Sequence, residues 1–320
     1  MKINQLKGIV LGLIATTFWA SFYPVGRVLF GREAEKFDEL FVSFLRFGFA
    51  FLFLLPFACS GGNLKKIRNE WKNDWKSWVG LATVGIVGEG IMVFVATKYT
   101  TAARASLLAN ASPIFTVLLS YLFVREALTM RKITGMTIGL AGILLIVTSQ
   151  GADLFSHTMS TLPGDLMALG SGVCWSAYTV FGERVANKYG GMLSTTILFF
   201  LGMVIMVPVM MVFQSRVTFD FPLTVWCGIV YLGCCNGLAN GLWYKALKYL
   251  KPGELGSFGY ISAIMTIGLS VIFLHETITW QFIVAVLLVL GGVALMLAQG
   301  RKIKAAQNDH PFRKQNNYTR

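Results

Sequence analysis

Long, continuously apolar runs recur along the whole chain, separated by short polar gaps. Each run is close to the ~20 residues that a helix needs to cross the hydrocarbon core of a bilayer. The runs are continuous rather than alternating, which favours helices over barrel strands. The sequence therefore predicts an all-α polytopic membrane protein with ten transmembrane helices. The predicted spans are Gly8–Phe30, Glu39–Phe57, Ser77–Thr97, Ala103–Val124, Lys132–Ser149, Gly164–Val185, Leu193–Phe213, Pro222–Tyr244, Gly253–Leu274 and Thr279–Ala298.

Composition excludes an ordinary soluble domain. Charged residues make up 13% of the 320-residue chain and hydrophobic residues 55%, whereas soluble domains carry about 25% charged residues. The run from Gly8 is too long for a signal-peptide core and lacks a small-residue cleavage site, so we expect it to remain as the first helix. The five cysteines show no CxxC spacing, so we expect no metal site, no disulfide and no cofactor.

The distribution of basic residues predicts the orientation of the chain. With the N-terminus inside, the inner gaps and both termini hold 21 of the 28 Lys and Arg, and the outer gaps hold four. Positive residues concentrate on the cytoplasmic side of membrane proteins, so both termini are predicted to be cytoplasmic. The net charge of +13 is therefore a topology signal and does not indicate nucleic acid. We expect a multi-pass protein of the bacterial cytoplasmic (inner) membrane.

The chain also repeats itself. Residues 98–149 align with residues 248–299 at a constant offset of 150, and 14 of the 52 pairs are identical, among them Ser112/Ser262 and Glu126/Glu276. The first span echoes the sixth, with Trp19 over Trp175. Each repeat holds five spans, and an odd number inverts the second copy in the membrane. We predict a cytoplasmic N-terminus (1–7), a first repeat (8–150), an extracytoplasmic linker (151–163), a second repeat (164–299) and a disordered cytoplasmic tail (300–320).

Inverted repeats are typical of secondary transporters, in which two related halves move about a site near the bilayer midplane. The sequence has no P-loop and no HExxH motif, and its three His fall in predicted loops or the tail. An enzyme and an ATP-driven pump are therefore not expected. A channel would need a ring of polar residues, and a receptor or sensor would have no need of inverted repeats.

Several short motifs resemble those of the drug/metabolite transporter superfamily, and within it the EamA-like transporters. The motifs that carry this resemblance are Phe18-Trp19-Ala20-Ser21 with Arg27, Leu45-Arg46-Phe47, Pro113-Ile114-Phe115, Arg125-Glu126-Ala127-Leu128-Thr129, the glycines 135, 139 and 142, and His275-Glu276-Thr277-Ile278-Thr279. The resemblance covers nearly all of residues 8–299. Two positions depart from the pattern: Ala263 replaces a proline, and Glu183 stands where a cation is common.

The resemblance implies a transporter that works by alternating access on a small metabolite, namely an amino acid or related compound, or an amphipathic drug-like molecule. Export is the expected direction, with import or exchange as the alternative. The expected partners are a small-molecule substrate, the lipid bilayer and protons as a coupling ion. The patterns define no oligomeric state.

Polar and aromatic residues inside the spans are the candidates for substrate binding. An acid at the centre of a span costs ~2.5–3.5 kcal/mol on insertion scales, so Glu89 should face a cavity or an ion-pair partner. The expected partner is Arg46. It would then bind an amine, exchange a proton or form a structural ion pair. The aromatic and amide candidates have helix packing as their alternative role. The full set is Trp19, Tyr23, Glu89, Asn110, Trp175, Tyr178, Asn236, Asn240 and Tyr260.

Five further charged residues are candidates for gating or charge pairing. Two repeat-related pairs, Arg27/Glu183 and Arg104/Glu254, place a basic residue toward the exterior and an acidic one toward the cytoplasm, as salt bridges that close one face would require. The fifth residue, Arg46, is the expected ion-pair partner of Glu89. The alternative is interfacial anchoring by side chains that reach the headgroups. These candidates are Arg27, Arg46, Arg104, Glu183 and Glu254.

Overall fold

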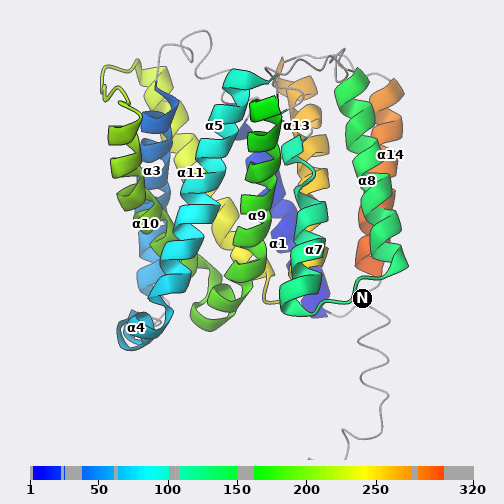
Figure 1. Ribbon diagram of the computed structural model, residues 1–320, viewed down its shortest axis with the longest axis horizontal. Helices are drawn as coiled ribbons and strands as arrows, with labels where there is room; N and C mark the ends of the chain where they lie inside the picture. Colours follow the sequence, from blue (N-terminus) through cyan, green and yellow to red (C-terminus); the bar gives the residue numbers. More distant parts are fainter. Residues whose placement is uncertain are drawn as a thin grey trace, which may run out of the picture.

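The computed structural model describes residues 3–22, 25, 38–60, 64–100, 105, 108–149, 162–274 and 280–298. Every regular element within these ranges is a helix, and most of the helices run alongside one another from one end of the bundle to the other (Figure 1). The prediction of an all-helical protein is confirmed. The predicted tail from residue 300 and the linker over 151–161 lie outside the described residues.

The first half of the chain forms seven of these elements. Two of its helices, α3 and α8, match predicted spans to within about three residues, whereas α1 begins five residues before the predicted first span and α4 thirteen residues before the predicted third. A π-helical stretch (η2) lies between α4 and α5. The elements are α1 (Ile3–Ala20), α3 (Glu39–Ser60), α4 (Leu64–Leu81), η2 (Ala82–Gly88), α5 (Glu89–Tyr99), α7 (Ser112–Val124) and α8 (Met130–Ser149). Thus α4, η2 and α5 form one continuous helical segment in which the predicted third span begins near the end of α4.

The second half of the chain forms the remaining elements. The predicted ninth span is interrupted at Ser257, so that the short helix α12 precedes α13. The elements are α9 (Leu162–Tyr189), α10 (Gly191–Val212), α11 (Leu223–Ala246), α12 (Pro252–Gly256), α13 (Phe258–Leu274) and α14 (Trp280–Ala298).

Five stretches of the described residues are long and apolar enough to cross a membrane. They are Glu39–Cys59, Asn73–Val93, Gly191–Val212, Leu223–Ala246 and Trp280–Ala298. Many apolar side chains on these helices are exposed, for example Leu287 at 68% and Val212 at 78%. Exposed apolar side chains on long helices are what a lipid environment favours.

Helix packing follows a paired pattern between the two halves of the chain. Helix α1 packs against α11 and α13, and α9 packs against α5 and α7. By chain order, α9 holds in the second half the place that α1 holds in the first. Helices α8 and α14 pack along each other at one edge of the bundle (Figure 1), and α3 packs on α10 near the opposite edge.

Close helix contact at the α8–α14 edge depends on glycine. A side chain at Gly292 would collide with the backbone at Gly135 and Gly139, and one at Gly135 would collide with the backbone at Gly292. Small residues let two helix backbones approach where lipid supplies no hydrophobic drive for association. The turn between α9 and α10 also needs glycine, because Gly190 has a φ of 91°.

Candidate functional site

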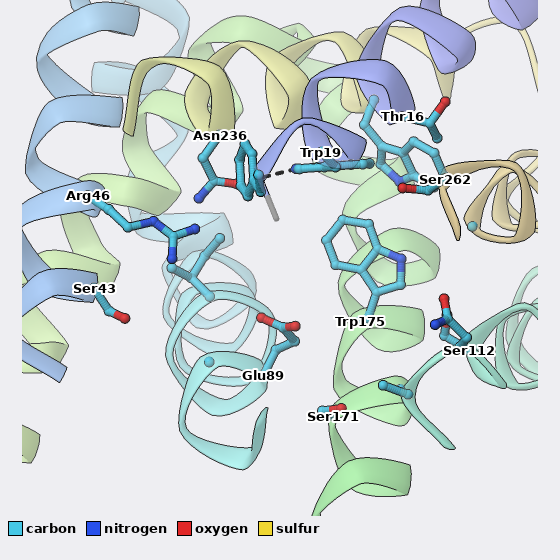
Figure 2. A pocket seen from close by; sticks show the side chains of 18 of the residues that line it. Thr16, Trp19, Ser43, Arg46, Glu89, Ser112, Ser171, Trp175, Asn236 and Ser262 are labelled. Carbon is cyan, nitrogen blue, oxygen red and sulfur yellow. Dashed lines mark hydrogen bonds between the residues drawn. The ribbon is translucent and has the colours of Figure 1, made fainter. Parts of the chain in front are cut away.

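A cavity of about 340 Å³ lies in the middle of the bundle (Figure 2). Side chains from both halves of the chain reach it, from α1 and α3 to α11 and α13. Its lining combines aromatic rings, small hydroxyls, amides and two charged groups: Thr16, Trp19, Phe22, Ser43, Arg46, Phe47, Ile86, Glu89, Gly90, Ala109, Asn110, Ser112, Ser171, Gly172, Trp175, Asn236, Trp243, Gly259 and Ser262. A few placed polar groups in an apolar pocket are typical of small-molecule sites.

Three tryptophans from three helices meet on one side of this cavity. The Trp19 and Trp175 rings meet edge to face, with centroids 5.0 Å apart and an interplanar angle of 88°. Trp243 of α11 contacts both, at 5.2 Å from Trp19 and 5.7 Å from Trp175. These separations match favourable aromatic geometries, so the cluster gives the cavity a rigid aromatic wall.

Hydrogen bonds fix the orientation of this wall. The Trp19 indole N–H donates to the side-chain oxygen of Asn236 at 3.3 Å (Figure 2). The same oxygen accepts from the amide nitrogen of Asn240, one turn further along α11, at 3.0 Å. Trp243 donates its indole N–H to Thr179 at 3.1 Å. Trp19 and Trp243 are thus each tied to a polar partner on another helix.

The two charged groups of the cavity are Arg46 on α3 and Glu89 at the start of α5. Both side chains point into the space between the helices (Figure 2). The salt bridges among the described residues join Glu126 to Lys132 and Asp74 to Arg184 and Lys188, and do not include Arg46 or Glu89. Arg46 lies over the Phe22 ring at 5.4 Å, and its buried Nε has no hydrogen-bond partner. The cavity therefore contains a separated positive and negative group.

The π-helical stretch η2 ends directly before Glu89. Such stretches are rare and occur often at functional sites, because they rotate the following residues relative to an α-helix. Gly90 follows Glu89, and a side chain added at Gly90 would meet no heavy atom within 4 Å. Open space beside the carboxylate leaves it accessible to a ligand in the cavity.

Of the predicted substrate-binding residues, Trp19, Glu89, Asn110, Trp175 and Asn236 line the cavity. The other described candidates lie elsewhere. Asn240 is buried behind Asn236 and orients it. Tyr178 is buried, with its ring against Trp175 and Tyr244. Tyr260 is buried against Gly139 of α8. Its hydroxyl also donates a long hydrogen bond to the carbonyl of Met136 on the same helix, at 3.5 Å.

Of the described candidates for gating or charge pairing, one lines the cavity and two lie elsewhere. Arg46 lines the cavity. Glu254 accepts a hydrogen bond from the Lys251 backbone N–H at 3.2 Å and so caps α12. Glu183 lies in a separate groove beside α4 and α7. Arg27 and Arg104, like the aromatic candidate Tyr23, lie outside the described residues.

Sequence reasoning missed Trp243 and the serines of the cavity. A signal for Trp243 existed: it follows Asn236 and Asn240 at helical spacings of seven and three, which places all three on one stripe of α11. Ser112 and Ser262 stood out as a repeat pair without being assigned to a site. Ser43 and Ser171 have no comparable sequence signal.

Two aromatic rings and a hydrogen bond join α9 to α11 on the side of the cavity toward α4. The rings of Tyr178 and Tyr244 lie 4.7 Å apart, and the Tyr244 hydroxyl donates to the Tyr178 carbonyl at 3.1 Å. Both side chains are fully buried. Side chains at Gly85 and Gly182 would collide with Tyr178 and Tyr244 respectively, so glycine makes room for these rings.

A helical bundle with exposed apolar faces and a polar–aromatic cavity at its centre has the architecture of a membrane transport protein. The family is shown directly by the sequence, which matches the EamA-like transporter family over residues 6–148 and again over residues 162–298. The chain belongs to this family.

Named relatives are transporters. The chain is 26% identical to the "uncharacterized transporter YyaM" of Bacillus subtilis, over 77% of this chain and 80% of that protein. It is also 26% identical to the "aromatic amino acid exporter YddG" of Ancylobacter novellus, over 76% of this chain and 81% of that protein. A crystal structure that is 21% identical covers 92% of this chain and 98% of its own, with a TM-score of 0.78. That likeness shows the fold.

Proposed function

We propose that this transporter exports a small zwitterionic metabolite, an amino acid or a close relative with an apolar or aromatic side chain, by alternating access. The observation that carries the proposal is the cavity itself, which places Arg46 and Glu89 beside a wall of Trp19, Trp175 and Trp243. Import or exchange of the same compound is the alternative direction.

Each part of such a substrate has a matching group. The guanidinium of Arg46 binds a carboxylate, because its planar donors suit carboxylate geometry. The carboxylate of Glu89 binds the ammonium group. The tryptophan rings contact the side chain, and the Trp19 and Trp175 faces also attract a cation. A volume of about 340 Å³ is at the small end of ligand pockets, which suits a single amino acid.

The aromatic amino acid exporter among the relatives supports both the class of substrate and the direction. The three ring contacts of the cavity wall are consistent with an aromatic side chain, which would complete an edge-to-face cluster. An aliphatic side chain would bury apolar area against the same rings without that geometry.

The topology is also proposed here: ten spans in two inverted halves, with cytoplasmic termini in a bacterial inner membrane. The packing pairs of α1 with α11 and α13, and of α9 with α5 and α7, support the two-half arrangement. A cysteine at Ser156 or Ser215 should react with an impermeant reagent from outside intact cells, and one at Asn308 should not. Labelling at Asn308 would overturn the orientation.

Counterflow in proteoliposomes tests the substrate class. Proteoliposomes that contain the purified protein are loaded with unlabelled L-tryptophan or L-phenylalanine, and the same labelled amino acid is added outside. Two analogues then separate the charged groups: tryptamine, which lacks the carboxylate, and indole-3-propionate, which lacks the ammonium. Both analogues should compete at least tenfold less well than tryptophan, which corresponds to ~1.4 kcal/mol. Equal competition by all three compounds would contradict recognition of a zwitterion.

Single substitutions test which charged side chain binds which group of the substrate. Arg46→Gln should remove the preference for tryptophan over tryptamine, and Glu89→Gln should remove its preference over indole-3-propionate. Arg216→Gln and Asp220→Asn are matched controls, because both side chains lie exposed in the segment before α11. A reversed assignment, or unchanged preferences, would overturn the proposed substrate pose.

Glu89 is also the proposed site of proton coupling. A carboxylate that holds either a proton or the substrate ammonium exchanges one for the other across the membrane, which is antiport. Glu89→Gln should therefore abolish uphill transport driven by a pH gradient, while downhill exchange persists at lower affinity. Uphill transport that survives in the well-expressed variant would exclude this role.

A further inference from the structure

A second hollow lies apart from the central cavity, on the outer surface of the bundle. It has a volume of about 740 Å³, more than twice that of the cavity. The end of α4, η2, the last turn of α7 and the second half of α9 form its walls. Its lining residues on the described chain include Lys76, Val84, Phe123, Phe181, Glu183 and Arg184.

The inner part of this groove is apolar and open to the outside of the bundle. Val84 is 41% exposed, Phe181 43% and Phe123 61%. The Phe123 and Phe181 rings meet edge to face at 5.1 Å and so join α7 to α9. On the surface of a membrane protein, an exposed apolar groove of this kind contacts lipid chains.

The other end of the groove carries both signs of charge. Lys76 on α4 is exposed, and Arg184 on α9 donates to Asp74 at 3.1 Å while its side chain remains 74% exposed. Glu183 is half-buried and takes no part in the salt bridges among the described residues. The groove thus presents two cations at its rim and one free carboxylate beside them.

The depth of these groups suits a headgroup. Glu183 lies six residues before the end of α9, which is about 9 Å along the helix axis. The interfacial layer on each side of the hydrocarbon core is several ångströms thick, roughly half the difference between ~30 Å and ~40–45 Å. In the proposed topology, with the end of α9 at the cytoplasmic surface, the charged end lies near the boundary between headgroups and chains, and Phe181 and Val84 lie further in.

We propose that this groove binds an aminophospholipid, that is, a phospholipid whose headgroup carries a phosphate and a primary ammonium. Lys76 and Arg184 contact the phosphate, Glu183 accepts hydrogen bonds from the ammonium, and an acyl chain lies along Val84, Phe123 and Phe181. A quaternary headgroup has no N–H to donate to Glu183, and a phosphoglycerol headgroup places no cation beside it. The site is independent of the substrate proposed for the cavity.

Binding of defined lipids to the purified protein tests this site. The protein in detergent is titrated with phosphatidylethanolamine, phosphatidylcholine or phosphatidylglycerol of identical chains, and bound lipid is counted by native mass spectrometry. Phosphatidylethanolamine should bind about tenfold more tightly than phosphatidylcholine and should raise the thermal unfolding temperature more than either other lipid. Equal affinity for phosphatidylethanolamine and phosphatidylcholine would overturn the proposal.

Two variants locate the site. Glu183→Gln keeps the size of the side chain and should abolish the preference for phosphatidylethanolamine over phosphatidylcholine. Lys76→Gln should weaken all three phospholipids severalfold, whereas Lys248→Gln, an exposed cation near the end of α11, should change none of them. A preference that survives in Glu183→Gln would place the lipid elsewhere and overturn the assignment, whether or not tryptophan transport is intact.

Discussion

At each end of the bundle an aspartate joins the two halves of the chain. The contacts that the two aspartates make differ in strength. At the end that carries α4, Asp74 contacts the corner where α9 passes into α10. At the other end, Asp38, just before α3, contacts the segment between α10 and α11. In each case an aspartate of the first half of the chain contacts the second half: Asp74 contacts the last two turns of α9, and Asp38 contacts the segment between α10 and α11.

The Asp74 corner is charged and buried. Asp74 is 3% exposed, and it accepts hydrogen bonds from Lys188 at 2.6 Å, Arg184 at 3.1 Å and the Tyr189 hydroxyl at 2.6 Å. Nearby, Glu126 pairs with buried Lys132 and accepts from the Gly253 backbone N–H at 3.0 Å. This second contact joins the turn after α7 to the start of α12.

The Asp38 corner has no cation among its described partners. Asp38 accepts hydrogen bonds from the Ser215 hydroxyl and from the backbone N–H groups of Leu40 at 3.0 Å, Phe41 at 3.0 Å and Arg216 at 3.2 Å. Burial acts to raise the pKa of the Asp38 carboxyl, but these hydrogen bonds outweigh burial and hold its pKa below the ordinary value.

This difference indicates which end of the bundle is held together more strongly. The hydrogen bonds at both corners are charge-assisted, because each aspartate is ionised. Those of Asp74 come from two cations as well as a hydroxyl, whereas those described for Asp38 come from neutral donors. The α4 end also has the closely packed, tilted rings of Tyr178 and Tyr244. A transporter that opens each end in turn must break the contacts of that end. The described contacts at the α4 end are therefore the more costly to break.

The largest effect is expected at Glu126. Glu126→Gln leaves Lys132 as an unpaired cation whose side chain is 6% exposed, and stranding a buried charge costs about 3–5 kcal/mol. Thermal unfolding of the purified protein in detergent measures this loss. The double change Glu126→Gln with Lys132→Met removes both charges and should recover most of it. A single variant as stable as the unaltered protein would show that the pair is not needed to hold this end.

A smaller loss is expected at Asp74. Asp74→Asn should lower the free energy of unfolding by about 2 kcal/mol, within the range for hydrogen bonds to charged groups. The effect is below that at Glu126 because Arg184 and Lys188 remain partly exposed and regain water. Tyr189→Phe, which removes one neutral donor, is the matched milder variant. If Asp74→Asn proved no more costly than the same change at Asp38, the contrast between the two ends would fail.

The cavity between the two ends provides the third test. Trp19→Ala or Trp175→Ala should lower transport of tryptophan at least tenfold, about 1.4 kcal/mol in transition-state terms, while the protein still reaches the membrane. Counterflow rates normalised to the amount of reconstituted protein provide the measurement. Normal transport after removal of both tryptophans would assign them to packing alone.

The sequence predicted the bounds of α3 and α11 well because span length and apolar composition are local properties. It placed Glu39–Phe57 against the observed α3 of Glu39–Ser60, and Pro222–Tyr244 against α11 of Leu223–Ala246. It did not predict the break at Ser257 or the π-helical stretch before Glu89, because both depend on packing against other helices.

The site was predictable in part for the same reason. A polar or aromatic residue inside a span must face protein, and Trp19, Glu89, Trp175 and Asn236 do line the cavity. Composition cannot distinguish a side chain that faces a cavity from one packed behind it. Tyr260 and Asn240 are packed behind the residues that line the cavity. The rotation of each helix in the bundle decides whether a given side chain faces the cavity or packs behind it.

The smallest effect is expected at Asp38, and its sign depends on pH. Because the pKa of the folded carboxyl lies below its ordinary value, the ionised side chain stabilises the fold above about pH 4, and this contribution is lost as the pH falls through the folded pKa. Asp38→Asn should cost about 1 kcal/mol at neutral pH, since the amide oxygen still accepts hydrogen bonds. The difference in unfolding temperature between the unaltered protein and Asp38→Asn should therefore shrink toward pH 3. Asp220→Asn, an exposed carboxylate in the segment before α11, should show no such difference at any pH. A gap that widened on acidification would mean that Asp38 is stabilised in its protonated form, and the Asp38 corner would then be held by a neutral carboxyl rather than by the carboxylate.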